Sequence, residues 1–248
     1  MSRVKHNALH QFSAGFNTVQ DSGPASLPFA TPGQQGWKIQ TENFGGGATP
    51  ADGILWESVV ETSGTTTHGV NGGLITTDGN DNSSGWLGWT TPTYVPGAAT
   101  KKFYLETSVI LTAATMASNE MFVGFTSDQS TTAFVAADGL TWAFDDGFGF
   151  GKLDAETEIS FISGQNETGA AHQTVGLGST FTTATRTTLA CYYDGTNFNL
   201  YKDNVFVKSA AKSTLNDDAA TGAVIYAKAG TGAAQTLLVH YITLATEL

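Results

Sequence analysis

Apolar residues recur at every second position in many short runs of this chain, which is the pattern of strands with one buried face. The clearest run covers residues 187–193, where alternate side chains from Leu189 to Tyr193 would face the same side of a sheet. Residues 197–201 and a run that starts at Val205 would form the next two strands. An Asp-Gly pair and an Asp-Asn pair separate these runs, and such pairs favour tight hairpin turns.

Similar runs continue along most of the chain and are separated by Gly, Asn, Asp and Thr. The further strands we expect are residues 37–40, 55–61, 73–77, 86–89, 102–112, 121–126, 140–144, 149–153, 158–162, 223–228 and 236–246. The Ala-rich stretches 113–119 and 209–220 lack an apolar stripe, so we expect almost no helix. Many short strands with turns between them predict an all-β protein, a sandwich or a jelly roll.

The N-terminal residues 1–35 have a different pattern, with scattered apolar residues and prolines at Pro24, Pro28 and Pro32. Proline removes backbone donors and restricts φ, so this segment should be extended. It is either a disordered tail or an arm that docks on a neighbouring subunit, and its apolar anchors favour the arm. The anchors would be Phe12, Phe16, Leu27 and Phe29. The sandwich domain would then cover residues 36–248.

Composition excludes several classes of protein. Acidic residues outnumber basic ones by 22 to 11, which gives a net charge of −11 and makes nucleic-acid binding implausible. Only 13% of the residues are charged, so the surface must be built largely from Thr, Ser, Asn, Gln and Gly. The single cysteine, Cys191, permits no disulfide within the chain and reads as a buried thiol. We expect neither a signal peptide nor a membrane partner, because no apolar run is long enough.

Residues 186–207 resemble part of the concanavalin A-like, or laminin-G-like, β-sandwich. The matching residues are Tyr193-Asp194-Gly195-Thr196, Leu200-Tyr201 and Val205, and the segments FYLETSV at 103–109 and MFVGFT at 121–126 resemble two earlier strands of that superfamily. The resemblance covers roughly residues 70–248. It implies an antiparallel sandwich of jelly-roll type, and it implies no single function, because lectins, glycosidases and structural modules share this fold.

Glycosidases of that superfamily carry the pattern Glu-x-Asp-x-x-Glu on one strand. Retaining hydrolysis needs two carboxyl groups about 5–5.5 Å apart. The nearest segment here contains Asp154, Glu156 and Glu158, in a different order and without aromatic residues among them. We expect a solvated acidic turn there, no catalytic residues, and therefore no enzyme.

Oxygen-rich loops are the other candidates for a site. Residues 78–85 and the pair Asp145-Asp146 resemble calcium loops in composition, but Asx turns explain them without a metal. The five histidines show no ligand spacing. We therefore expect no metal and no cofactor. Trp86 and Trp89, in the sequence GWLGW, are the best candidates for an exposed aromatic patch that stacks on sugar rings, although core or interface packing is the use we expect of them.

The sandwich, the proline-rich arm and the Thr- and Gly-rich composition together are similar to structural proteins of tailed bacteriophages. That similarity implies a capsid cement or decoration subunit, located in the virion and assembled in the host cytoplasm. Its partners would be the major capsid protein or other virion subunits, and it would form a homo-oligomer, with a trimer favoured. The first alternative is a carbohydrate-binding module for host attachment on a head or tail fibre. The second is a glycoside hydrolase that uses Asp154, Glu156 and Glu158.

Overall fold

The computed structural model describes two stacked sheets and a few connecting segments. The described residues are 37–42, 56–61, 64–69, 72–80, 83–89, 94, 101–127, 134–135, 141–165, 172–216, 219–230 and 234–247. The expected arm with its anchors Phe12, Phe16, Leu27 and Phe29 lies outside the described residues.

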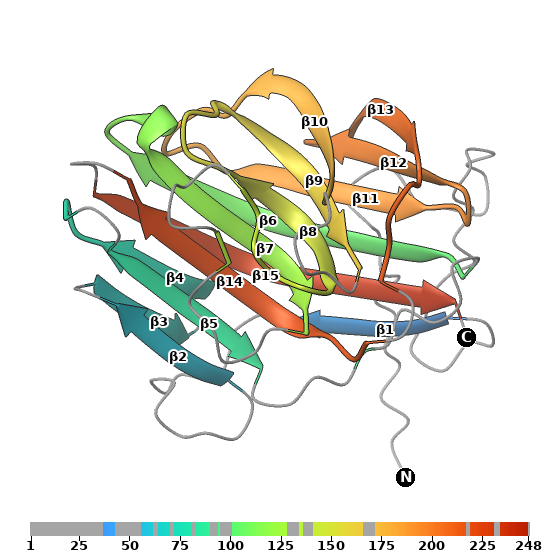
Figure 1. Cartoon of the computed structure of the whole chain (residues 1–248), viewed down its shortest axis with the longest axis horizontal. Coiled ribbons are helices and arrows are strands. Elements are labelled where there is room, and N and C mark those ends of the chain that lie inside the picture. Colours follow the sequence, from blue (N-terminus) through green and yellow to red (C-terminus); the bar gives the residue numbers. More distant parts are fainter. Residues whose placement is uncertain are drawn as a thin grey trace, which may run out of the picture.

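Sheet A is an antiparallel sheet of eight strands (Figure 1). Its main path runs in the order β13 (Val205–Ala211), β12 (Asn197–Lys202), β11 (Thr187–Tyr193), β6 (Phe103–Ala113), β15 (Gln235–Glu247), β4 (Gly72–Thr77) and β3 (Gly64–Gly69). The eighth strand, β1 (Trp37–Glu42), pairs with the C-terminal half of β15. β6 pairs with nearly the whole length of β15 on one side. On the other side of β15, β4 pairs with its N-terminal half and β1 with its C-terminal half.

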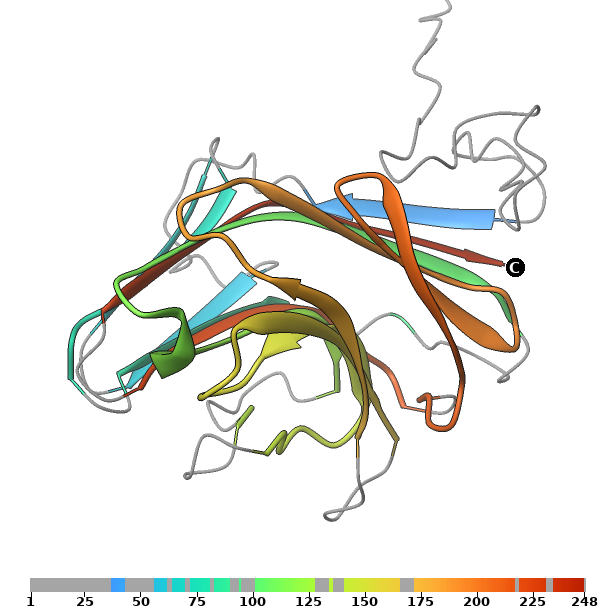
Figure 2. The ribbon, with the colours of Figure 1, turned by 90° about the horizontal axis from the view of Figure 1, so that it is seen from above.

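Sheet B has seven antiparallel strands and packs face to face on sheet A, as the edge-on view in Figure 2 shows. Its order is β10 (Gln173–Thr180), β9 (Glu158–Gly164), β8 (Gly147–Lys152), β7 (Asn119–Thr126), β14 (Gly222–Ala229), β5 (Ser84–Trp89) and β2 (Trp56–Glu61). The described helix is one short 3-10 turn, η2 (Met116–Ser118). The expected all-β sandwich of jelly-roll type is confirmed.

The main core lies between the sheets and consists of the inward side chains of both. Phe103 on β6 and Phe148 on β8 meet across this interface with ring centroids 4.7 Å apart. Farther along, Phe198 on β12 packs on Phe161 of β9 at 4.9 Å. Both pairs join one sheet to the other, so burial of these rings holds the two layers together.

A second apolar cluster lies on the outer face of sheet B, the face turned away from sheet A. Its members include Trp86 on β5, Phe122 on β7 and Tyr226 on β14, whose strands are neighbours in the sheet. Phe134 and Phe144, from the segment before β8, complete the cluster, and Figure 2 shows this segment beyond sheet B. The outer face of this sheet is therefore apolar and covered.

The sequence GFGFG in β8 explains how both faces of sheet B are filled. Phe148 and Phe150 point inward, so the glycines between them face the outer cluster. A Cβ atom on Gly151 would lie 2.4 Å from Cη2 of Trp142, and one on Gly149 would lie 2.7 Å from Cζ of Phe122. The absence of side chains at these positions lets aromatic rings lie directly on the sheet.

Gly151→Ala should therefore lower the free energy of unfolding by about 2–3 kcal/mol, in the upper part of the usual cost of overpacking a filled site. Urea denaturation measures the change. Gly178→Ala is the control, because nothing lies within 4 Å of a Cβ there and only its positive φ of 70° is costly. We expect about 1 kcal/mol for the control, and equal losses in both variants would contradict the close packing of Trp142 on Gly151.

The predicted hairpins of sheet A are confirmed. Asp203 and Asn204 both have positive φ, 50° and 68°, as a two-residue turn between twisted strands requires. Asp194 closes the preceding hairpin, because its Oδ1 accepts hydrogen bonds from the amides of Thr196 at 2.8 Å and Asn197 at 2.7 Å. Both aspartates act in turn formation.

One expected strand is absent from the described residues, and two observed strands were not expected. Residues 140–144 do not form a strand in the described part of the chain; Val135 and Trp142 make one isolated bridge, because this segment lies on sheet B and does not enter it. β3 and β10 were not predicted, since Thr- and Gly-rich sequences such as GTTTHG show little apolar alternation. The stretch 209–220 begins with the end of β13, and its described residues, 209–216 and 219–220, are not helical, as expected.

Candidate functional site

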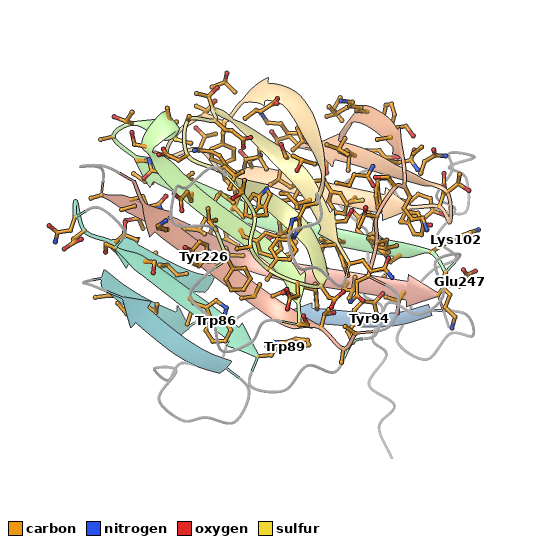
Figure 3. The ribbon with its side chains drawn as sticks, viewed as in Figure 1. Trp86, Trp89, Tyr94, Lys102, Tyr226 and Glu247 are labelled. Carbon is orange, nitrogen blue, oxygen red and sulfur yellow. The ribbon has the colours of Figure 1, made fainter. Side chains whose placement is uncertain are left out.

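Of the two candidates for an exposed aromatic patch, Trp86 lies inside the molecule, as the expected packing requires, whereas Trp89 is only partly buried. Trp86 has 0% of its surface exposed and lies beside Tyr226 in the outer cluster of sheet B (Figure 3). Trp89 packs edge-on against Phe125, with centroids 5.9 Å apart. The buried ring of Trp86 is therefore not available to stack on a sugar, while part of Trp89 remains exposed. Both residues lie on β5, in agreement with the strand expected at residues 86–89.

An open polar depression at one end of sheet B is the best-formed candidate site among the described residues. We call it the β9–β10 hollow. It has a volume of about 390 Å³ and is lined by Ala155, Glu156, Thr157, Glu158, Gly178, Ser179 and Thr180. Its walls come from the turn that precedes β9 and from the last residues of β10. Two carboxylates and three hydroxyl groups thus face a common space.

The shape of the hollow follows from an irregularity in β10. The pairing of β10 with β9 shifts between Gly176 and Thr180, and Gly178 takes a positive φ of 70° within that shift. The chain then bulges away from β9. The amide of Gly178 donates to Oε2 of Glu158 at 2.9 Å, which fixes this carboxylate at the floor of the hollow.

Two further contacts position the walls. Oε2 of Glu156 accepts a hydrogen bond from the amide of Leu153 at 3.1 Å, which orients that carboxylate. Lys202, on β12 of the other sheet, donates through Nζ to Oγ of Ser179 at 2.8 Å. The second oxygen of each carboxylate remains in position to accept hydrogen bonds from a ligand, and the hydroxyls can both donate and accept.

The structure separates the three acids that the sequence placed together. Glu156 and Glu158 both line the hollow, whereas Asp154 does not and accepts a hydrogen bond from the amide of Ala155 at 2.9 Å. Sequence reasoning missed Ser179 and Thr180, because they lie on a strand that it did not predict. No spacing in the sequence connects them to Glu156; only the pairing of β9 with β10 does.

A buried ion pair lies on the outer face of sheet B, in the row of residues that leads to the hollow. Nζ of Lys228 on β14 is 3.4 Å from Oε2 of Glu120 on β7, and the side chains are 9% and 2% exposed. Burial raises the pKa of Glu120 to about 7, although Lys228 acts to lower it. A carboxyl with a raised pKa is a common feature of general acids, but this one is enclosed and paired with a lysine.

Glu106 is another buried carboxylate, and it lies on the outer face of sheet A. The hydroxyl of Tyr241 on β15 donates to its Oε1 at 2.6 Å, and the hydroxyl of Tyr104 donates to its Oε2. Nothing in the sequence marks this group, because Tyr241 comes from a position 135 residues away from Glu106 in the chain. Both tyrosine hydroxyls donate to the carboxylate of Glu106, and the bond from Tyr241 joins β15 to β6. This buried cluster therefore does not form an open site.

The oxygen-rich loops form turns where the structure describes them. Oδ1 of Asp78 accepts a hydrogen bond from the amide of Asn80 at 3.0 Å, which is an Asx turn.

Nε2 of His172 is 2.8 Å from the carbonyl oxygen of Phe144, and burial lowers the pKa of this histidine. Within the described ranges, no group of three or more His, Cys, Asp or Glu residues is arranged to hold a metal ion.

Cys191 is buried, as expected, and burial raises the pKa of its thiol well above the ordinary value. The parts of the chain that the structure describes contain no helix long and apolar enough to cross a membrane.

Comparisons with known proteins identify relatives by structure alone. No protein-family profile matches the sequence, and no curated protein matches it significantly. The metal-free carbohydrate recognition domain of Emp46p superposes with a TM-score of 0.54 at 11% identity, covering 82% of this chain and 94% of that chain. A β-1,3-glucanase from Mycobacterium marinum gives 0.54 at 13% identity, covering 83% and 97%.

A third similar structure is the protein of unknown function SO2946 from Shewanella oneidensis MR-1. It has a TM-score of 0.55 at 10% identity and covers 88% of this chain and 90% of that chain. None of these comparisons supports a bacteriophage or capsid context. The expected capsid partners, trimeric state and virion location stay untested predictions.

The exclusion of enzymatic activity requires correction. Structures of this fold include the glucanase and a glycosyl hydrolase family protein from Mycobacterium fortuitum, with a TM-score of 0.53 at 10% identity. The absence of the Glu-x-Asp-x-x-Glu pattern from the sequence is therefore no ground for excluding catalysis. At these identities the comparisons establish the fold alone, an antiparallel β-sandwich of jelly-roll type.

Proposed function

We propose that this protein is a carbohydrate-binding protein and that it holds a sugar in the β9–β10 hollow. One observation carries the proposal: two carboxylates and three hydroxyl groups from two strands and a turn line one open space of about 390 Å³. That volume lies within the usual range of small-molecule sites. Sugars present rows of hydroxyl groups, and a lining of acceptors and two-way hydroxyls complements them.

The contacts within the hollow favour binding by a preorganised surface. Glu158 is held by the Gly178 amide, Glu156 by the Leu153 amide, and Ser179 by Lys202. Groups that are already oriented lose little conformational freedom when a ligand arrives. Hydrogen bonds from sugar hydroxyls to an ionised carboxylate are stronger than those between neutral groups. Carbohydrate recognition by a domain of similar fold also supports the proposal.

The test is a glycan array, followed by calorimetry with the best neutral oligosaccharide. The double variant Glu156→Gln/Glu158→Gln keeps the size of both side chains and removes both charges. We expect at least a tenfold weaker affinity, which corresponds to about 1.4 kcal/mol. Asp154→Asn is the matched control, because this neighbouring acid lies outside the hollow, and it should bind like the wild type. A wild type that binds no glycan, or a double variant that binds normally, would refute the proposal.

Hydrolysis at the same hollow is the second candidate. The observation that favours it is the presence of both Glu156 and Glu158 in one open space, since glycosidases act through a pair of carboxyl groups. Release of reducing ends from polysaccharides measures the activity. If the protein is a hydrolase, either single Gln substitution should abolish turnover while binding persists. If it is only a binding protein, no reducing ends appear with any glycan that it binds.

A further inference from the structure

The free edge of sheet A at β13 is the most exposed apolar surface of the described residues. Val205 is 65% exposed and Phe206 is 54% exposed, and they stand side by side at the start of the strand. The ring of Phe206 leans edge-on against Tyr201 with centroids 5.6 Å apart, so it is held in place although solvent reaches it. Along β13, five of seven residues are exposed. Large apolar side chains so exposed commonly mark contact surfaces.

The backbone of β13 also has unused hydrogen-bonding groups. The amide of Lys212 donates to the carbonyl oxygen of Thr196 at 2.9 Å. These two residues therefore form a hydrogen-bonded pair just beyond the paired ends of β13 and β12. Antiparallel pairs alternate, so Ser209, opposite Asn199, directs its N–H and C=O away from β12. The pairing register shifts between Leu200 and Tyr201, so the alternation near the Asp203–Asn204 turn is counted from that turn. On this count the N–H and C=O of Phe206 also point away from β12.

The other end of the strand is already closed. The outward carbonyl of Ala211 accepts a hydrogen bond from Nε2 of Gln173 at 2.7 Å. This contact agrees with the direction inferred for Ser209, because the backbone groups of Ser209 and Ala211 point to the same side of β13. It also leaves Phe206 and Ser209 as the open positions of the edge, among the residues that the structure describes. An open edge of this kind is a template for one more strand.

Charge selects the kind of strand that fits. The segment from residue 186 to residue 212 holds four basic and two acidic residues, a net charge of +2 in a chain whose total is −11. The basic residues are Arg186, Lys202, Lys208 and Lys212, and the acidic residues are Asp194 and Asp203. A second copy would bring the same basic segment to the edge, whereas an acidic segment would neutralise it.

We propose that β13 is a docking edge for an extended acidic segment of a partner protein, which adds to sheet A as a ninth strand. Backbone groups of Phe206 and Ser209 would bond the added strand, Lys208 would face its carboxylates on one face of the sheet, and Phe206 would pack on its apolar side chains on the other face. This surface is separate from the β9–β10 hollow, so the proposal stands or falls independently of carbohydrate binding.

The probe is a synthetic peptide that alternates glutamate with valine, compared with a peptide that alternates lysine with valine. We expect the acidic peptide to bind the full chain at least tenfold more tightly, with an affinity that falls as salt is added. It should also slow hydrogen exchange at the amides of Phe206 and Ser209. Equal affinity for the two peptides, or binding of neither, would overturn the proposal.

Ser209→Pro tests the mode of binding. Proline removes an outward N–H that β12 does not use, so the fold should tolerate it, while strand addition should weaken at least tenfold. Ser209→Ala is the matched control and should bind as the wild type does. Lys208→Glu serves as a second variant if the proline variant does not fold, and it should lose the preference for the acidic peptide. Concentration-dependent dimerisation that Ser209→Pro abolishes would show a second copy as the occupant and overturn the acidic-partner proposal.

Discussion

Phe148→Ala should lower the free energy of unfolding by about 3–5 kcal/mol, the usual cost of removing a fully buried phenylalanine. Phe148 is 0% exposed and lies between the sheets. Its ring is 4.7 Å from Phe103 of sheet A and 5.8 Å from Phe125 of its own sheet, measured between centroids. Urea denaturation at neutral pH measures the loss.

Phe206→Ala is the matched control, because the same atoms are removed from an exposed site. Its ring is 54% exposed and touches mainly Tyr201, so we expect a loss below about 1 kcal/mol. A similar loss in both variants would mean that the rings of the interior do not hold the sheets together. The same variant is informative for β13, since it should weaken binding of an acidic peptide without unfolding the protein.

Lys228→Met should destabilise the protein by about 3–5 kcal/mol at pH 8, because it leaves a buried carboxylate without its partner. The pair is enclosed, with side chains 9% and 2% exposed. At pH 5 the loss should be much smaller, since Glu120 can then take up a proton and become neutral. Urea denaturation at the two pH values measures the difference. The double variant Lys228→Met/Glu120→Leu should recover most of the stability at pH 8, because no buried charge remains.

The wild-type protein should show a related dependence on pH. Burial raises the pKa of Glu120 from 4.5 to about 7, so the folded state binds this proton more tightly than the unfolded chain does. The stabilising contribution is therefore complete below pH 4.5 and is lost as the pH rises through about 7. Glu120→Gln should remove this decline. Glu156→Gln, at an accessible carboxyl, should leave it in place, and an unchanged slope in Glu120→Gln would contradict the assignment.

Local pattern was sufficient for much of sheet A. The predicted strand at residues 187–193 coincides with β11, and Asp203-Asn204 forms the expected turn. These elements alternate cleanly and are bounded by residues that tolerate positive φ, so their structure depends on nearby residues alone. β3 and β10 were missed because their threonines and glycines gain strand structure from neighbouring strands and not from an apolar pattern of their own.

The same limit explains the tryptophans. The sequence places Trp86 and Trp89 on an expected strand, but it leaves open whether their rings pack inside the protein or form an exposed patch. In the structure, Trp86 lies flat over Gly88, where a Cβ atom would come within 2.2 Å of its ring. A glycine can form a turn, or it can leave space for an aromatic ring to pack on the backbone. Which of these occurs depends on the neighbouring strands, and strand order is a property of the whole sheet.

The sequence by itself determined the class of fold, its hairpin turns and the low charge of its surface, because each depends on composition or on residues close together in the chain. The tertiary structure alone decided which polar groups share a site. Glu156 meets Ser179 through the pairing of β9 with β10, and Glu120 meets Lys228 through the pairing of β7 with β14. Such contacts follow from strand order, and strand order is set by the packing of the whole sandwich.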